Sequence, residues 1–352
     1  MTGIRARITR RSILKAGVAA TTVMAAPSIV RAQSKTIVTT SYGGAYEQNY
    51  RKFVLDPFTA KTGAEFVIKY GGADAWLNSA VINKAAPEID LPMLSVPVAA
   101  RAIKIPDLFI DLNTNNVPNI RDIHPIFYDT YEGRAVGFNY TDYSFLYDTT
   151  KVNPGPSSWA ELWEPRFKSQ LLCPGPTAGS MYEMILVAAK LNGGSEDNYL
   201  PGIEAMKRLK PNVVRWFTNS NEVEGLMARG EASLTAGYAG FRGYAAIDAG
   251  LPYKVVIPTE GAPMGVLSFH VPVNARNRDL LLDFVNFALA SEQQTAFGNA
   301  MASGMCSNKT VLDPKLAARI APADKLLRID WGKLQTRLSD ITLRMQREVF
   351  TG

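Results

Sequence analysis

Cysteine and histidine are scarce in this chain of 352 residues, which contains two of each. Cys173 and Cys306 lie far apart in the sequence, which leaves open whether they form a disulfide or are two small buried apolar side chains. His124 and His270 have no close group of cysteines or acids around them, so the usual pattern of a zinc site is missing. We therefore expect no metal and no cofactor.

An excess of charge of one sign is also lacking once the first 32 residues are set aside. The chain has 38 Lys and Arg residues against 32 Asp and Glu residues, a net charge of +6. Six of the basic residues and no acidic residue lie between Met1 and Ala32, so the remainder of the chain is neutral. A nucleic-acid binder needs a lasting surplus of Lys and Arg on one face. We expect no nucleic-acid partner.

Long apolar runs are lacking too, and the one candidate looks like an export signal. Residues 16–29 are small and apolar but fall short of the ~20 residues that span a bilayer. They follow Arg10 and Arg11 and lead to small residues ending at Ala32, which is the layout of a secretory signal peptide. The arginine pair resembles a twin-arginine (Tat) signal. We expect residues 1–32 to be cleaved after Ala32 and the mature protein to be soluble and periplasmic.

The signatures of common enzymes are absent from the sequence. No Gly-x-Ser-x-Gly elbow is present, no histidine lies near a candidate nucleophile, and the glycines do not form a dinucleotide fingerprint. We therefore rank an enzyme last among the possible functions.

Strand-like and helix-like segments alternate along the chain after residue 34. Short β-branched runs predict strands, and apolar residues at helical spacing predict helices, the first of which should end at Gly63. Such alternation predicts an α/β protein with parallel strands covered by helices. The predicted strands include residues 36–40, 65–70 and 253–258, and the predicted helices include residues 46–62, 75–85, 181–191 and 279–290.

The segment of residues 157–168 carries two tryptophans, Trp159 and Trp163, behind a serine cap. On its residues alone it predicts a short helix whose aromatic pair packs as a structural staple. It also resembles the Ser-Trp-Ala-Asp-Leu-Trp segment of periplasmic solute-binding proteins of the polyamine-binding type. Further segments match the same family in order along nearly the whole mature chain, namely residues 147–149, 151–152, 229–232, 258–261 and 271–275.

This resemblance implies a periplasmic-binding-protein type II fold, with two discontinuous α/β domains joined by a hinge of two crossings near Asn139 and Gly265. The first domain would take residues 34–136 and 266–314, and the second residues 137–265. Residues 315–352 would form C-terminal helices over the second domain. Such a protein is a monomer that closes over a small solute and delivers it to an inner-membrane ABC permease.

The resemblance also places a set of residues at the ligand cleft. Glycines after the first two strands would let a ligand approach the backbone, although the same residues also fit plain strand-to-helix turns. Tyr140 fits either the cleft or hinge packing, and Arg242 fits either an anion clamp or a solvated surface. The expected ligand-binding residues are Ser41, Tyr42, Gly43, Gly44, Tyr70, Gly71, Gly72, Asp74, Ser95, Tyr140, Thr177, Ser180, Tyr238, Arg242, Gly265 and Leu267.

Departures from the family pattern bear on the ligand. Leu267 stands where polyamine binders have an aspartate, Gly265 replaces a tryptophan, and the loop of residues 174–180 lacks the family's acidic cluster. A desolvated polyamine needs opposing carboxylates, whereas helix-start donors suit an oxyanion. We therefore expect a solute with a carboxylate or another oxyanion. The alternatives are a true spermidine or putrescine receptor and, behind it, an iron(III) receptor.

Overall fold

The computed structural model describes residues 35–176 and 178–351, and the chain from Lys35 onward forms one compact unit. The predicted signal peptide, with Arg10, Arg11 and the cleavage site after Ala32, lies outside the described residues, and so does Thr177. Within the described ranges, no helix is both long and apolar enough to cross a membrane.

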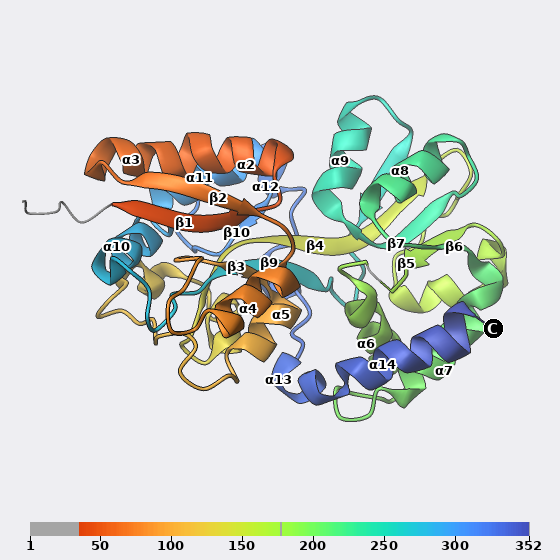
Figure 1. Cartoon of the computed structure of the whole chain (residues 1–352). Helices are drawn as coiled ribbons and strands as arrows, with labels where there is room; N and C mark the ends of the chain where they lie inside the picture. Colours follow the sequence, from red (N-terminus) through yellow and green to blue (C-terminus); the bar gives the residue numbers. More distant parts are fainter. Residues whose placement is uncertain (1–34, 177, 352) are drawn as a thin grey trace, which may run out of the picture. The chain divides into compact units, whose positions relative to one another are not determined.

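The strands of the described chain form a small sheet and a larger one (Figure 1). Their bounds are β1 Thr36–Ser41, β2 Glu65–Tyr70, β3 Met93–Ser95, β4 Val136–Asp148, β5 Leu171–Pro174, β6 Val213–Phe217, β7 Leu234–Ala239, β8 Tyr253–Val256, β9 Met264–Phe269 and β10 Gly304–Met305. The small sheet pairs β1 with β2. The larger sheet has the order β3-β9-β4-β7-β5-β6, and β8 and β10 also pair with β4.

The helices lie on both sides of these strands. Their bounds are α2 Gly44–Tyr50, α3 Asp56–Thr62, α4 Ala73–Ile82, α5 Val96–Ala102, α6 Met181–Leu191, α7 Leu200–Leu209, α8 Ser220–Ala228, α9 Gly240–Asp248, α10 Arg278–Ala288, α11 Ser291–Met301, α12 Pro314–Ala317, α13 Trp331–Leu334 and α14 Leu338–Arg344. A π-helical segment, Arg51–Leu55, connects α2 to α3. Gly63, with φ of 71°, ends α3 in the left-handed conformation, as the sequence predicts.

The mixed α/β class predicted from the sequence is confirmed, but the expectation of parallel strands is only partly right. Parallel pairs join β1 to β2 and join β5 to both β6 and β7. The long strand β4 is antiparallel to β7, β8, β9 and β10. Periodicity shows where strands lie in the sequence but not which strands become neighbours, so the direction of these pairs could not be predicted.

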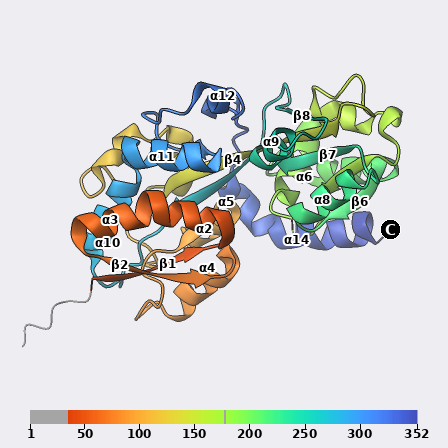
Figure 2. The same ribbon diagram turned by 90° about the horizontal axis from the view of Figure 1, so that it is seen from above.

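Strand β4 connects two groups of elements. Both views place α2, α4 and α5 toward one end of β4 and α6 and α9 toward the other (Figures 1 and 2). Asn139 in β4 pairs with Leu267 in β9, so the two predicted crossings are hydrogen-bonded neighbours. The division into domains of residues 34–136 with 266–314 and of residues 137–265 stays a prediction.

The C-terminal segment contacts elements from both of these predicted domains. Helix α13 packs against α5, which precedes β4, and the terminal π-helix Met345–Phe350 packs against α7, which follows it. The sequence predicts packing over the second domain, and this division into domains stays a prediction. The segment therefore forms a further connection between the two groups of elements, beside β4 and β9.

The two tryptophans of the family-like segment serve the fold. Residues Trp159–Trp163 form a 3₁₀ helix capped by Ser158. The Trp159 indole donates a hydrogen bond of 2.8 Å to the Gly261 carbonyl, and its ring meets Phe145 edge-on at 4.5 Å. Trp163 donates 2.7 Å to the carbonyl of Ala205 in α7. The pair ties this helix to its neighbours, as the structural interpretation of the sequence expects.

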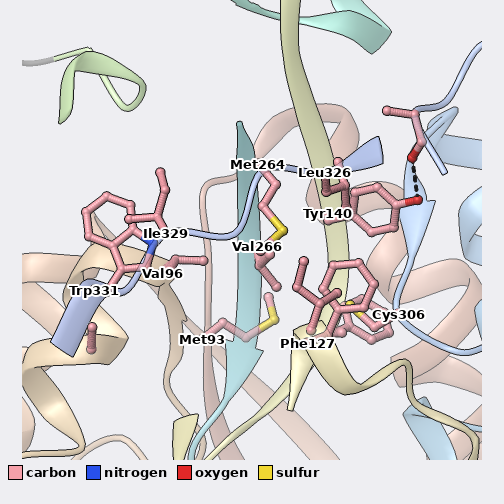
Figure 3. Close-up of a cluster of buried hydrophobic side chains, with 14 of the residues drawn as sticks. Met93, Val96, Phe127, Tyr140, Met264, Val266, Cys306, Leu326, Ile329 and Trp331 are labelled. Carbon is pink, nitrogen blue, oxygen red and sulfur yellow. Dashed lines mark hydrogen bonds between the residues drawn. The ribbon is translucent and has the colours of Figure 1, made fainter. Parts of the chain in front are cut away.

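A buried apolar cluster surrounds the middle of β4 (Figure 3). Tyr140 is 5% exposed, its ring stacks on Phe127 at 4.7 Å, and its hydroxyl donates 2.9 Å to the carbonyl of Ala321. Cys306 lies in the same cluster and, like Cys173, is buried and free. Tyr140 therefore packs in the core in this structure, and its contact with a ligand stays a prediction.

Replacing Tyr140 with Phe should destabilise the protein without weakening ligand capture. The change removes the hydroxyl that donates to the buried Ala321 carbonyl. Leaving this carbonyl without a donor should lower the free energy of unfolding by about 1–3 kcal/mol. Urea unfolding of both proteins measures the loss. Unchanged stability together with weaker ligand binding would contradict this role and return Tyr140 to the ligand site.

Candidate ligand cavity

A cavity of about 630 Å³ lies beside β4, within the size range of small-molecule sites. Residues from both groups of elements line it. From the group of α2, α4, α5 and α11, together with β9, come Tyr42, Tyr46, Asp74, Ser95, Val96, Pro97, Val98, Gly265, Val266, Leu267, Met301 and Ser303. From β4, α6, α9 and the loop before α6 come Asn139, Thr141, Tyr143, Pro176, Ala178, Gly179, Tyr182, Glu183 and Phe241.

One face of β4 contributes Asn139, Thr141 and Tyr143, because alternate residues of a strand point to the same side. In the ladder with β9, Thr141 lies opposite Gly265. A Cβ atom at Gly265 would come within 2.6 Å of the Tyr143 hydroxyl. Glycine at this position therefore leaves room for the Tyr143 ring at the cavity.

Hydrogen bonds hold the polar side chains where α2 meets β4. The Tyr46 hydroxyl donates 3.0 Å to Asn139 Oδ1, and Asn139 Nδ2 donates 3.2 Å to Ser303 Oγ. Ser303 Oγ in turn donates 2.8 Å to the Tyr140 carbonyl. These groups are positioned before any ligand arrives, so this part of the cavity is preorganised.

Aromatic rings supply much of the remaining wall, namely those of Tyr42, Tyr46, Tyr143, Tyr182 and Phe241. Burial raises the pKa of Tyr42 to about 12, with the negative charge of Asp74 as the second cause. Burial also raises the pKa of Tyr46 and of Tyr143. These phenols stay protonated at neutral pH, so they present neutral hydroxyls and π faces to a ligand.

Glu183, in the first turn of α6, is the most unusual group of the cavity. Its side chain is 1% exposed, and among the described residues no hydrogen-bond partner reaches its Oε2 atom. Burial raises the pKa of this carboxyl to about 8, against a hydrogen bond from its own backbone N–H that lowers it. A buried carboxyl without a partner costs free energy, which identifies it as a candidate for ligand contact.

Asp74, the other acid of the cavity, has a different environment. It lies in the first turn of α4, its side chain is 71% exposed, and it forms an ion pair with Arg101. No Lys, Arg or His lines the cavity within the described residues. These residues also contain no group of three His, Cys, Asp or Glu that could hold a metal ion. The cavity therefore presents acids and neutral donors but no side-chain cation.

The structure brings five of the expected ligand-binding residues to this cavity and leaves most of the others outside its lining. Those that line it are Tyr42, Asp74, Ser95, Gly265 and Leu267. Those outside the lining are Ser41, Gly43, Gly44, Tyr70, Gly71, Gly72, Tyr140, Ser180, Tyr238 and Arg242, and Thr177 lies outside the described residues. Contact of any of them with a ligand stays a prediction.

Each polar side chain outside the lining has another partner. Tyr70 is exposed and donates 3.1 Å to Glu47, and the buried Ser180 hydroxyl donates 2.6 Å to the Gly237 carbonyl. Tyr238 donates 2.8 Å to Glu224, which also forms an ion pair with Arg242. Arg242 is thus held at Glu224, and its neighbour Phe241 lines the cavity in its place.

Sequence reasoning missed Glu183, because its place in the cavity depends on how distant segments of the chain pack together. Glu183 lies on a predicted helix, but its approach to Tyr143 of β4 follows from the sheet order. A carboxyl near the start of a mostly apolar helix, Met181–Leu191, was the available signal, because a fully buried acid without a paired charge is rare.

Comparison with known proteins identifies the family. Residues 54–323 match the model of the bacterial extracellular solute-binding proteins. The chain belongs to this family. The spermidine/putrescine-binding periplasmic protein of Salmonella typhimurium is 33% identical to this solute-binding protein over 135 residues, 38% of each chain, so the match covers well under half of that relative. The γ-aminobutyric acid-binding protein of Pseudomonas aeruginosa is 23% identical over 316 residues, 85% of each chain.

Solved structures share the fold as well. An ABC transporter protein from Clostridium perfringens superimposes with a TM-score of 0.79 at 22% identity, over 89% of this chain and 99% of that one. The type of fold expected from the sequence is confirmed at this level. Members of the family are transport-binding proteins, and the spermidine/putrescine-binding relatives are named as periplasmic.

Replacing Glu183 with Gln should stabilise the empty protein at pH 8 more than at pH 5. A carboxyl whose pKa is raised by folding stabilises the folded state fully below its unfolded pKa, and this contribution is lost as pH rises toward 8. One such proton makes the free energy of unfolding fall by about 1.4 kcal/mol per pH unit between the two pKa values. The variant lacks this dependence on pH. Thermal unfolding from pH 5 to 8.5 measures the difference.

Glu204→Gln, on the exposed side of α7, is the matched control and should parallel the unchanged protein at every pH. A constant difference between Glu183→Gln and the unchanged protein over the whole range would show that the Glu183 carboxyl does not titrate there.

Proposed function

We propose that this chain is the periplasmic receptor of an ABC importer and captures a small organic solute in the cavity beside β4. The solute carries one ammonium group and one oxyanionic group. The observation that carries the proposal is the charge pattern of the cavity, which has acidic side chains and no basic one among the described residues. Family membership supports the receptor role and its delivery of the solute to an inner-membrane permease.

The acidic and aromatic groups suit the ammonium end of such a solute. An ammonium desolvated in a cavity needs a carboxylate, and Glu183 offers a buried one. The faces of Tyr42, Tyr143 and Phe241 add cation–π attraction. The GABA-binding relative, which matches over 85% of the chain, is named for a compound with one amine and one carboxylate.

Backbone donors suit the oxyanionic end. The first N–H groups of a helix have no partner within the helix and carry partial positive charge. Gly179, just before α6, and Phe241, in the first turn of α9, both line the cavity. The start of each helix therefore supplies the positive potential that an oxyanion needs where a basic side chain is missing.

A polyamine remains the second candidate because the spermidine/putrescine-binding relative is 33% identical over its matched segment. Two ammonium groups would need two carboxylates. Asp74 is the second acid of the cavity, but it is exposed and already paired with Arg101. An iron(III) ligand set is less favoured, because the raised pKa values of Tyr46 and Tyr143 oppose the phenolate form.

Calorimetry with matched compounds tests the ligand class. We expect 4-aminobutyrate and 5-aminovalerate to bind more tightly than butyrate or butylamine, each of which lacks one of the two charged groups. The matched pairs measure each group separately, and every tenfold loss corresponds to about 1.4 kcal/mol.

Two results would contradict this assignment. Sub-micromolar binding of putrescine or spermidine, with weak binding of the amino acids, would restore the polyamine alternative. Equal affinity for butyrate and 4-aminobutyrate would show that the cavity does not recognise the ammonium group.

Export through the twin-arginine route is part of the same proposal. Its support is Arg10-Arg11 ahead of an apolar stretch, with small residues ending at Ala32. Replacing Arg10 and Arg11 with lysine keeps the charge of the leader and should leave uncleaved precursor in the cytoplasm. Cell fractionation measures this, and a normal periplasmic yield would refute the route while leaving the receptor role intact.

A further inference from the structure

Glu183 combines features that no other acid among the described residues shares. It lines the cavity, its side chain is 1% exposed, and its Oε2 atom has no partner within the described chain. It extends from α6, whose residues on the other sides pack against α7 and β7. Glu183 therefore lies on the cavity side of a helix that is otherwise part of the core.

We propose that Glu183 binds the ammonium group of the solute and loses its own proton in doing so, so that capture of the solute releases a proton. This inference rests on the proposed function, because it assumes a ligand that carries an ammonium group. In the step, the carboxylic acid gives its proton to solvent, and the resulting carboxylate pairs with the ammonium, which keeps its three N–H bonds. The net charge of Glu183 and the bound ammonium falls from +1 to 0, and the proton released to solvent carries the difference.

Burial supplies the physical reason for this exchange. In the empty protein the carboxyl is 1% exposed, and burial raises its pKa to about 8, so the neutral form predominates at neutral pH. A cation within hydrogen-bond distance favours the charged form and lowers the pKa again. The proton is therefore bound in the empty state and lost in the loaded state.

Among the described residues, the surroundings of Glu183 contain no cationic side chain that would keep its carboxyl charged in the empty state. Tyr143 also lines the cavity. Burial raises the pKa of Tyr143, the negative charge of Glu183 raises it further, and Tyr143 offers no positive charge. Lys207 of α7 is paired with Glu204 and Glu348, away from the cavity. The titratable groups on the elements around α6 and in the cavity are Glu161, Lys190, Glu204, Lys207, Arg208, Tyr238, Asp340, Arg344, Tyr42, Tyr46, Asp74, Tyr143 and Tyr182.

Asp74 is the competing site for the ammonium. Its carboxylate is exposed and paired with Arg101, which already supplies a positive charge. An ammonium bound there would meet a carboxylate that solvent screens and that Arg101 already pairs, so it would bind weakly. Glu183 is therefore the stronger site for the ammonium group.

The test is titration calorimetry of the full mature protein with 4-aminobutyrate and with putrescine between pH 5.5 and 8.5. Both compounds keep their charges across this range. For the unchanged protein, the dissociation constant should fall by about tenfold per pH unit until pH reaches about 8 and then level off. Measurements at pH 6.5 in two buffers of different ionisation enthalpy should report about one proton released per ligand bound.

Variants separate the role of Glu183 from a structural effect. Glu183→Gln keeps the shape of the side chain and should weaken binding by about 30-fold or more at pH 8, with no pH dependence and no proton release. Glu204→Gln on α7 is the matched control and should bind as the unchanged protein does. Asp74→Asn should retain the pH dependence, and its loss in that variant would assign the proton exchange to Asp74 and overturn the proposal.

The remaining outcomes distinguish failure of this inference from failure of the proposed function. If either compound binds Glu183→Gln as tightly as it binds the unchanged protein, only the role of Glu183 is overturned. Binding that weakens as pH rises would show that neutral Glu183 donates a hydrogen bond to the ligand, which also overturns the exchange. If the folded, unchanged protein binds neither compound, the ammonium class of ligand fails and this inference fails with it.

Discussion

The hydrogen-bonded ladder of β4 is the constraint on which the rest of the structure depends. One strand of thirteen residues pairs with β9 and β10 along its first part and with β7 and β8 along its second. Because these pairings fix its register, Asn139, Thr141 and Tyr143 must point to one side together. The hydrogen bonds that join both groups of elements to β4 therefore also fix the positions of these three cavity residues. They cannot move without breaking the sheet.

Flexibility between the two groups of elements has to come from around this ladder. The first crossing predicted from the sequence lies in β4 and the second in β9, and the two are directly paired through Asn139 and Leu267. The C-terminal segment makes a third connection, with α13 on α5 and the last π-helix on α7. Any closing motion must bend or twist paired strands rather than unfold a loop, while the Tyr182–Thr342 hydrogen bond of 2.9 Å links that segment to the cavity wall.

Local features could be read from the sequence, and long-range ones could not. The helix Met181–Leu191, the strand Glu65–Tyr70 and the stop at Gly63 follow from periodicity and backbone preference, which act over a few residues. Resemblance to a known family supplied the class of fold. The loops after the first two strands were expected at the ligand, yet of the ligand-binding residues expected there only Tyr42 and Asp74 line the cavity. Which residues of a loop face inward depends on packing between distant segments, which local pattern does not contain.

The acidic side chains of the cavity do not come from the sequence positions that carry them in polyamine binders. Sequence comparison indicated too few carboxylates for a cationic group, because the positions that carry them in polyamine binders are Leu267 and an uncharged loop. The fold supplies a carboxylate from another position, Glu183, one turn into α6.

Its desolvation is part of the free energy of folding, so a solute does not have to remove its water at the moment of binding. An uncharged solute of the same shape would leave this carboxyl protonated and unpaired, as it is in the empty protein, and so would gain no binding free energy from it. Under the proposed function, selectivity for an ammonium group follows from an acid that folding has already buried and whose Oε2 atom has no partner in the described chain.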